Sequence, residues 1–115
     1  MIVRLLGPED LPLLLSADAQ LFDDPVRPAS AAAFLADGRH HMAAAFVGTA
    51  IVGFASAVDY LHPDKSPELW INEVGVLPAF QRRGHGSAIM RCLIGHGWSI
   101  GCGVAWVLTD SGNRV

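Results

Sequence analysis

Residues 76–90 read VLPAFQRRGHGSAIM, and the fold that the sequence predicts is built outward from this stretch. Two glycines and two arginines lie between an apolar run typical of a strand and a segment with the apolar spacing of a helix. A helix that begins near Gly84 and Gly86 leaves backbone N–H groups without helical partners, and these groups attract anions together with the helix dipole. Glycine also allows an anion to approach the backbone closely. The turn therefore predicts a local anion site.

Two common phosphate-binding motifs do not fit this turn. A Walker loop ends in Gly-Lys-Ser/Thr, whereas Gly86 is followed directly by Ser87. A dinucleotide fingerprint needs a third glycine where this chain has Ile89. Arg82 and Arg83 would each add a charge-assisted hydrogen bond of about 1.5–3 kcal/mol. On spacing alone, a plain strand-to-helix connection with solvated arginines fits equally well.

The pattern on both sides of the turn predicts a mixed α+β domain with the element order β-α-α-β-β-β-α-β. Apolar runs predict strands at 2–6, 41–48, 50–60, 69–77 and 104–109. Helices are expected from Leu11 to Phe22, from Ser30 to Ala36 and after the turn. The apolar face of the last helix comprises Ile89, Met90, Leu93, Ile94 and Trp98. Strands two to four form an antiparallel meander, and the helical crossover makes the last two strands parallel.

Length and charge bound the class of protein. A chain of 115 residues is one domain's worth, so we expect a single domain over residues 1–115. A hydrophobic fraction of 51% with 17% charged residues is typical of a compact globular protein. The net charge of −3 excludes the broad basic surface that nucleic-acid binding needs. No apolar run approaches the roughly 20 residues of a membrane span, so we expect a soluble, cytoplasmic protein.

Cysteine and histidine do not make a convincing metal site. Cys92, Cys102 and His96 supply three ligand types without a fourth, on an otherwise apolar helix. We therefore expect no metal, and reduced thiols in the interior.

The stretch VGVLPAFQRRGHGSAIM resembles the acetyl-CoA signature of the GNAT superfamily of N-acetyltransferases. Gln81, Arg83, Gly84 and Gly86 match its Gln/Arg-x-x-Gly-x-Gly/Ala pattern. Longer blocks are similar to the gentamicin-type aminoglycoside 3-N-acetyltransferases: LFDDP at 21–25, residues 34–76, and AWVLTDSGN at 105–113. The resemblance implies acetyl transfer from acetyl-CoA to an amine of a polycationic aminosugar antibiotic.

The resemblance also implies where the cofactor lies. Val74, Gly75 and Val76 would face the pantetheine arm, and the Val76 N–H would polarise the thioester carbonyl. Asn113 would reach the cofactor as well. The pyrophosphate would lie in a cradle made of Gln81, Arg82, Arg83, Gly84, His85, Gly86 and Ser87.

A carboxylate must take the proton of the ammonium substrate, and Glu73 is our candidate for this catalytic base. The alternative is that Glu73 faces solvent on an alternating strand. Asp110 is the preferred substrate contact, because it follows the strand beside the cofactor channel. Further carboxylates for a polycation are Asp23, Asp24, Asp64 and Glu68, and each alone suits a cap, a turn or a surface charge equally well. His62, in the same loop as Asp64, would contact substrate or shape the turn.

The chain departs from the resembled family after residue 113. Family members continue with a helix whose tyrosine protonates the leaving thiolate and with two strands, whereas this chain stops at Val115 and Tyr60 does not match that tyrosine. The resemblance therefore implies a C-terminally truncated member with slow or absent catalysis. An unpaired edge on the fifth strand implies a homodimer or strand exchange. Two alternatives stay open: acetylation of another amine, such as a protein N-terminus, a lysine or a polyamine, and a non-catalytic CoA-binding or interaction fragment.

Overall fold

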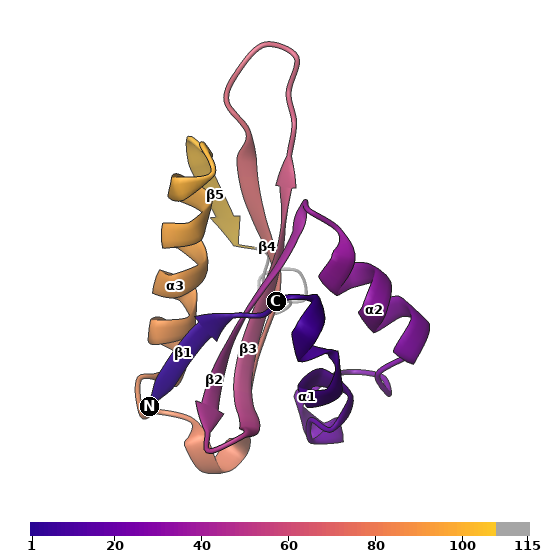
Figure 1. Ribbon diagram of the computed structural model, residues 1–115. Coiled ribbons are helices and arrows are strands. Elements are labelled where there is room, and N and C mark those ends of the chain that lie inside the picture. The colour runs from indigo at the N-terminus through magenta and orange to yellow at the C-terminus, as the bar shows by residue number, and fades with distance from the viewer. Residues whose placement is uncertain (108–115) are drawn as a thin grey trace.

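The computed structural model describes residues 1–107, which form one five-stranded sheet in the order β1-β2-β3-β4-β5 (Figure 1). The strands are β1 (Ile2–Leu5), β2 (His40–Val47), β3 (Ala50–Tyr60), β4 (Glu68–Val76) and β5 (Val104–Val107). Pairing is antiparallel from β1 to β4 and parallel between β4 and β5. The predicted mixed α+β class, element order and parallel crossover are confirmed.

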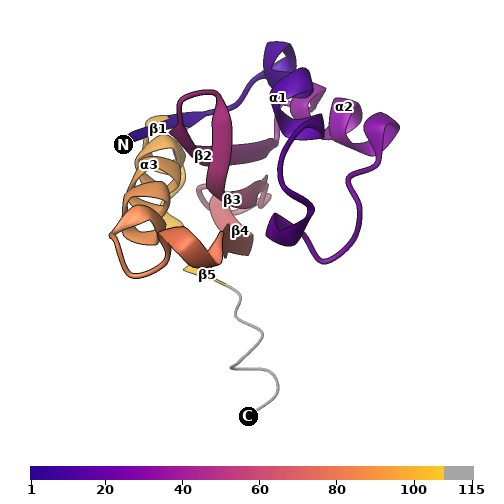
Figure 2. The same ribbon diagram turned by 90° about the horizontal axis from the view of Figure 1, so that it is seen from below.

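Helices cover both faces of this sheet (Figure 2). They are α1 (Leu11–Leu15), α2 (Pro28–Ala36) and α3 (His85–Ser99), with short 3-10 turns η1 (Pro8–Asp10), η2 (Ala19–Leu21) and η3 (Pro78–Phe80). One core cluster joins α3 to the sheet and includes Ala43, Ala45, Leu69, Ile71, Ile89 and Leu93. The other joins α1 and α2 to the opposite face and includes Leu14, Leu35, Met42, Ala44 and Phe54. Successive side chains of β2 therefore pack into the two cores in alternation, as expected of a strand buried on both faces.

The first helix is much shorter than predicted. Its expected range of Leu11 to Phe22 breaks at Leu15, and the chain then forms the separate turn η2. Side chains satisfy the backbone there in place of helical bonds: Ser16 Oγ donates to the Leu13 carbonyl at 3.0 Å. The Asp18 carboxylate accepts from the Gln20 N–H at 2.9 Å. A loop rather than a helix therefore lies between α1 and α2, over the sheet.

The buried face of α3 also differs from the prediction. Ile89 and Leu93 are fully buried as expected, but Trp98 is 55% exposed. The next buried position on this face is Gly97. A Cβ at this residue would lie 2.9 Å from Leu69 Cδ2, so the position suits glycine. The glycine thus lets the helix approach β4 closely.

Within the described residues, the helices are too short or too polar to cross a membrane.

Candidate functional site

A β-bulge in β4 determines where the Glu73 side chain lies. Ile71 pairs with Ala57 and Glu73 pairs with Ser56, so Asn72 is one extra residue in the ladder. An extra residue reverses the alternation of side chains beyond it. Glu73 therefore lies on the α1/α2 face, although it would share the α3 face with Ile71 in a regular strand.

Glu73 lines a pocket of about 300 Å³ between β4 and the α1–α2 loop. The apolar wall comprises Leu14, Phe22, Pro25, Val26, Ala31, Phe34 and Met42. The polar lining comprises Asp23, Asp24, Arg27, Ser30 and Glu73.

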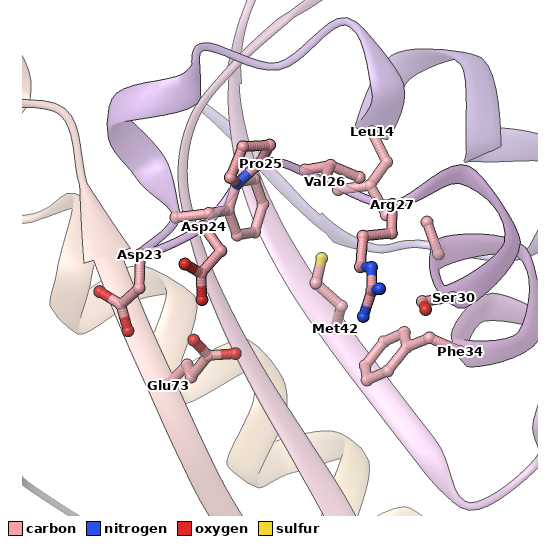
Figure 3. Close-up of a pocket in the computed structure, with 12 residues that line it drawn as sticks. Leu14, Asp23, Asp24, Pro25, Val26, Arg27, Ser30, Phe34, Met42 and Glu73 are labelled. Carbon is pink, nitrogen blue, oxygen red and sulfur yellow. The ribbon is translucent and has the colours of Figure 1, made fainter.

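The acidic side chains of this pocket gather at one end. Figure 3 shows the carboxylates of Asp23, Asp24 and Glu73 together, while Arg27 lies at the other end beside Ser30. All three acidic residues are exposed to solvent. The arrangement gives the pocket a negative end that attracts an ammonium group and a positive end that repels it.

The last residues of β4 present backbone groups beside the pocket. The Leu77 N–H donates to the Val52 carbonyl of β3 at 2.9 Å. Successive residues of a strand direct their N–H groups to opposite sides, so the Val76 N–H points away from β3. The described ladder with β5 runs only as far as Ile71 and Val107. The Val76 N–H thus points to the β5 side, where it lies beyond the part of that ladder that residues 1–107 form.

The turn after β4 begins α3 where the sequence predicted. Gly84 is the N-cap residue with φ 82, in the left-handed region that favours glycine, and α3 starts at His85. The first bond of the helix runs from the Ala88 N–H to the Gly84 carbonyl at 3.0 Å. The preceding N–H groups, those of His85, Gly86 and Ser87, have no carbonyl one helical turn back, and N–H groups of this kind attract anions.

Side chains of this turn hold its shape. The Gln81 side-chain amide donates to the Val76 carbonyl at 3.0 Å, which ties the turn to the end of β4. The Arg83 guanidinium lies 5.9 Å from the centre of the Phe80 ring, and the buried His85 ring lies 5.6 Å from it. The His85 side chain therefore packs beneath the turn, and its backbone N–H is the group that belongs to the anion site. Arg82, with φ 62, is exposed and free to approach an anion.

Other predicted site residues lie elsewhere. Asp110 and Asn113 lie outside the described residues. Asp64 lies in the β3–β4 loop, where it pairs with Lys65 at 3.3 Å. Glu68, at the start of β4, accepts a hydrogen bond from the Trp106 indole at 2.9 Å. Neither Asp64 nor Glu68 lines the pocket that Glu73 lines.

The cysteines do not form a metal cluster. Within residues 1–107, no three histidine, cysteine or acidic side chains meet in a group that could hold a metal ion. Burial raises the pKa of the Cys92 thiol and that of the Cys102 thiol.

Sequence reasoning missed a histidine relay on the α3 side of the sheet. His41 Nε2 lies 2.7 Å from the Asp59 carboxylate, and His96 Nε2 lies 3.1 Å from His41 Nδ1. Arg39 pairs with the same carboxylate at 3.5 Å. The relay joins β2, β3 and α3, and only the strand register brings its members together.

The chain belongs to the acetyltransferase (GNAT) family, because the model of that family matches residues 10–115. The α3 N-terminus, the end of β4 and the pocket beside it thus occur in an enzyme of the acetyl-transferring class. A search of curated protein sequences finds no significant match.

Several solved structures share the fold. An aminoglycoside acetyltransferase from an uncultured soil metagenomic sample, in complex with sisomicin, is 17% identical with a TM-score of 0.83; the match covers 98% of this chain and 80% of that chain. AAC(6')-Iy, in complex with the bisubstrate analogue CoA-S-monomethyl-acetylneamine, is 23% identical with a TM-score of 0.78 and coverage of 97% and 81%. A ribosomal-protein-alanine N-acetyltransferase from Brucella melitensis biovar Abortus 2308 is 21% identical with a TM-score of 0.73 and coverage of 98% and 86%. At identities this low, the similarity to these structures establishes the fold alone.

Proposed function

We propose that this protein transfers an acetyl group from acetyl-CoA to an amine of an aminoglycoside-type aminosugar. The observation that carries the proposal is the acidic end of the pocket, formed by Asp23, Asp24 and Glu73 near the end of β4. A substrate with several ammonium groups gains from several carboxylates, whereas a neutral acceptor gains nothing from them. Structures with the same fold contain sisomicin and a CoA-neamine conjugate, which supports this pairing of donor and acceptor.

The donor fits the turn and the strand edge. The α3 N-terminus suits the pyrophosphate because its N–H groups lack helical partners, and Arg82 and Arg83 add positive charge. The end of β4, from Val74 to Val76, offers backbone groups to the pantetheine arm. Acetyl-CoA supplies the activated acetyl group. The Val76 N–H would stabilise negative charge on the carbonyl oxygen as the amine attacks.

Glu73 would act as the base. The acceptor amine is protonated at neutral pH and must lose a proton before it can attack. Glu73 lies three positions before Val76 on β4, and the bulge at Asn72 directs its carboxylate into the acceptor pocket. Proton transfer to this carboxylate, directly or through one water, would leave a neutral amine facing the thioester.

The position acetylated on the sugar is part of the proposal. The sequence blocks favour the 3-amino group, whereas AAC(6')-Iy has the 6' position in its name. Two-dimensional NMR of the isolated product distinguishes the two positions. Acetylation at the 6'-amino group would contradict the 3-amino assignment and leave the acetyltransferase proposal intact.

We also propose that the chain forms a homodimer. Within residues 1–107, β5 pairs with β4 on one side, and its Val107 side chain is exposed. Such an edge is commonly covered by another chain. Sedimentation equilibrium at micromolar concentration should give twice the mass of 12.2 kDa, and a monodisperse monomer would contradict the proposal.

The function is tested by calorimetry with acetyl-CoA followed by an assay of free thiol release. We expect acetyl-CoA to bind, and sisomicin to release thiol faster than a lysine peptide or spermidine. Release with the peptide or spermidine alone would support another amine as substrate. Binding without release for every amine would support a non-catalytic CoA-binding protein.

A further inference from the structure

An aromatic cluster lies on the α1/α2 face of the sheet, in a part of that face that the two helices do not bury. In the β-ladders Trp70 pairs with Trp106, and Tyr60 pairs with Glu68. Leu69 and Ile71 belong to the core under α3, so alternation places Glu68 and Trp70 on the opposite face. The core under α1 and α2 draws its strand residues from β2 and β3 only, so these helices do not bury the cluster. Figure 2 shows β5 at the edge of the sheet that lies away from α1 and α2.

We name this cluster the Trp platform (Tyr60, Glu68, Trp70 and Trp106), and three of its side chains, those of Glu68, Trp70 and Trp106, contact one another. The two indole rings stack with centroids 5.5 Å apart and planes at 19°. The Trp106 indole N–H donates to the Glu68 carboxylate at 2.9 Å, which fixes a negative charge beside the rings. His62 Nε2 lies 3.5 Å from the same carboxylate oxygen.

Two members of the Trp platform are open to solvent, whereas Trp70 is half-buried and the Glu68 side chain is 15% exposed. Trp106 is 47% exposed and Tyr60 is 57% exposed. A cross-strand aromatic pair stabilises a sheet by itself, but that role needs neither an open indole nor a carboxylate fixed against it. Indole rings beside a carboxylate are a chemical match for an ammonium group on an apolar ring.

Position along β4 connects the Trp platform with the acceptor pocket. Glu68, Trp70 and Glu73 lie on one face of β4, because the bulge at Asn72 turns Glu73 to that face. Three residues of strand span roughly 10 Å, so Trp70 lies about that far from Glu73 along the strand. A molecule of linked rings can reach both positions, whereas a small monoamine cannot.

Given the proposed function, we propose that the Trp platform is a second subsite that binds a further charged ring of the acceptor aminosugar. The ring lies against the indoles, and one of its ammonium groups pairs with Glu68. The subsite makes the protein selective for acceptors with two or more linked amino rings. Trp70 and Trp106 are specificity residues in this account, and they take no part in the proton transfer assigned to Glu73.

The experiment compares a two-ring with a one-ring aminosugar. Calorimetry measures the Kd of neamine and of 2-deoxystreptamine for the full chain and for Trp106→Leu. We expect the substitution to weaken neamine binding by about 2- to 30-fold and to leave 2-deoxystreptamine binding within about 2-fold. Trp98→Leu is the matched control, because Trp98 is 55% exposed on α3 and outside the Trp platform. It should change neither Kd.

A second variant covers the case in which Trp106→Leu fails to fold. Glu68→Gln keeps an oxygen acceptor for the Trp106 indole but removes the charge, and it should also weaken neamine selectively. Equal weakening of both ligands, no weakening of neamine, or no binding of neamine by the unaltered protein would overturn the subsite. Selective weakening without any thiol release from acetyl-CoA would support the subsite while rejecting the proposed function.

Discussion

One residue, Asn72, decides the chemistry available to the acceptor pocket. As the extra residue of the bulge it turns Glu73 from the face of α3 to the face of α1 and α2. Alternation read from the sequence does not reveal this reversal, because INEVGV looks like a regular strand with two polar residues. The residue type and the family resemblance of the sequence made Glu73 a candidate base. The position of its side chain could be found only from the register of β3 and β4.

Replacing Glu73 tests its role as base. Glu73→Gln keeps the shape of the side chain but cannot accept the ammonium proton, so kcat with sisomicin should fall by about 10²- to 10⁴-fold. Binding of acetyl-CoA, measured by calorimetry, should not change. Asp64→Asn is the control, because the Asp64 side chain is 71% exposed and outside the pocket. A Glu73→Gln enzyme with full kcat would exclude Glu73 as the base.

Asp10 stabilises the first connection of the chain. Its buried carboxylate accepts two hydrogen bonds from Arg4, at 3.0 and 2.9 Å, and one from the Gly7 N–H at 2.8 Å. The hydrogen bonds from Arg4 are the main reason that the pKa of Asp10 lies below its usual value of 3.8. The stabilisation is therefore present above pH 3.8 and is lost as the pH falls through the lower pKa of the folded state.

Asp10→Asn should lower the free energy of unfolding by about 1–3 kcal/mol at pH 7. Urea denaturation followed by circular dichroism measures the difference from the unaltered protein. The difference should shrink as the pH falls below 3.8 toward the lower pKa of Asp10 in the folded state. A loss of stability that is the same at pH 7 and pH 2.5 would contradict the ionised pair.

At the scale of elements, the N-terminus of α3 is the proposed donor site. Glycine is favoured at position 84 because the backbone there has a left-handed φ of 82. At Gly86 an added Cβ would meet only Val76 Cγ2, at 3.9 Å. The backbone therefore tolerates a side chain at Gly86, and the space that this residue leaves is open for a ligand.

Gly86→Glu should reduce acetyl-CoA affinity at least about 100-fold, because its carboxylate would repel the pyrophosphate. Circular dichroism should stay nearly unchanged, since the added Cβ has room. Gly95→Glu in the same helix is the control: a Cβ on Gly95 meets no atom within 4 Å, and it lies more than two turns from the N-terminus. Calorimetry showing equal affinity for both variants would reject the anion site.

The elements were largely predictable from the sequence, and the two errors have local causes. Apolar runs predicted the five strands and the order of the elements along the chain. The turn at Gly84 predicted the start of α3. The helix predicted from Leu11 to Phe22 was wrong because Ser16 and Asp18 bond to the backbone in the middle of an apolar pattern. Trp98 was wrongly assigned to the core because the helical pattern alone does not show that Gly97 takes the buried position.

At the scale of the whole molecule, the histidine relay links stability to pH. Burial first, and the neighbouring His41 second, lower the pKa of His96 below 6.5, although Asp59 opposes this. The folded protein therefore binds a proton at His96 less readily than the unfolded chain does. The resulting stabilisation is complete above about pH 6.5 and is lost as the pH falls toward the lower pKa of the folded state.

His96→Gln tests this link, because glutamine keeps a side-chain N–H donor toward His41 but does not titrate. The free energy of unfolding of the unaltered protein should decrease from pH 8 to pH 5.5, and the variant should show a smaller decrease. Thermal denaturation across that range provides the measurement. Parallel pH profiles for the two proteins would contradict the assignment to His96.

The candidate site was predicted in part. The turn before α3 could be located from a local motif, and Glu73 from its residue type and the resemblance, while their roles stay predictions. The Trp platform and the histidine relay could not be located in this way, because each joins residues from three elements and depends on strand register. The acidic residues show the same limit: Asp23 and Asp24 line the pocket with Glu73, but Glu68 accepts from Trp106 outside it. The sequence alone does not show which carboxylates lie together, because their positions depend on the folded sheet.

The most direct test of the central claim is mass spectrometry of sisomicin after incubation with the protein and acetyl-CoA. We expect sisomicin to gain one acetyl group, one CoA thiol to appear per acetyl group, and Glu73→Gln to slow both together. Sisomicin that stays unmodified while the protein binds acetyl-CoA would contradict the account.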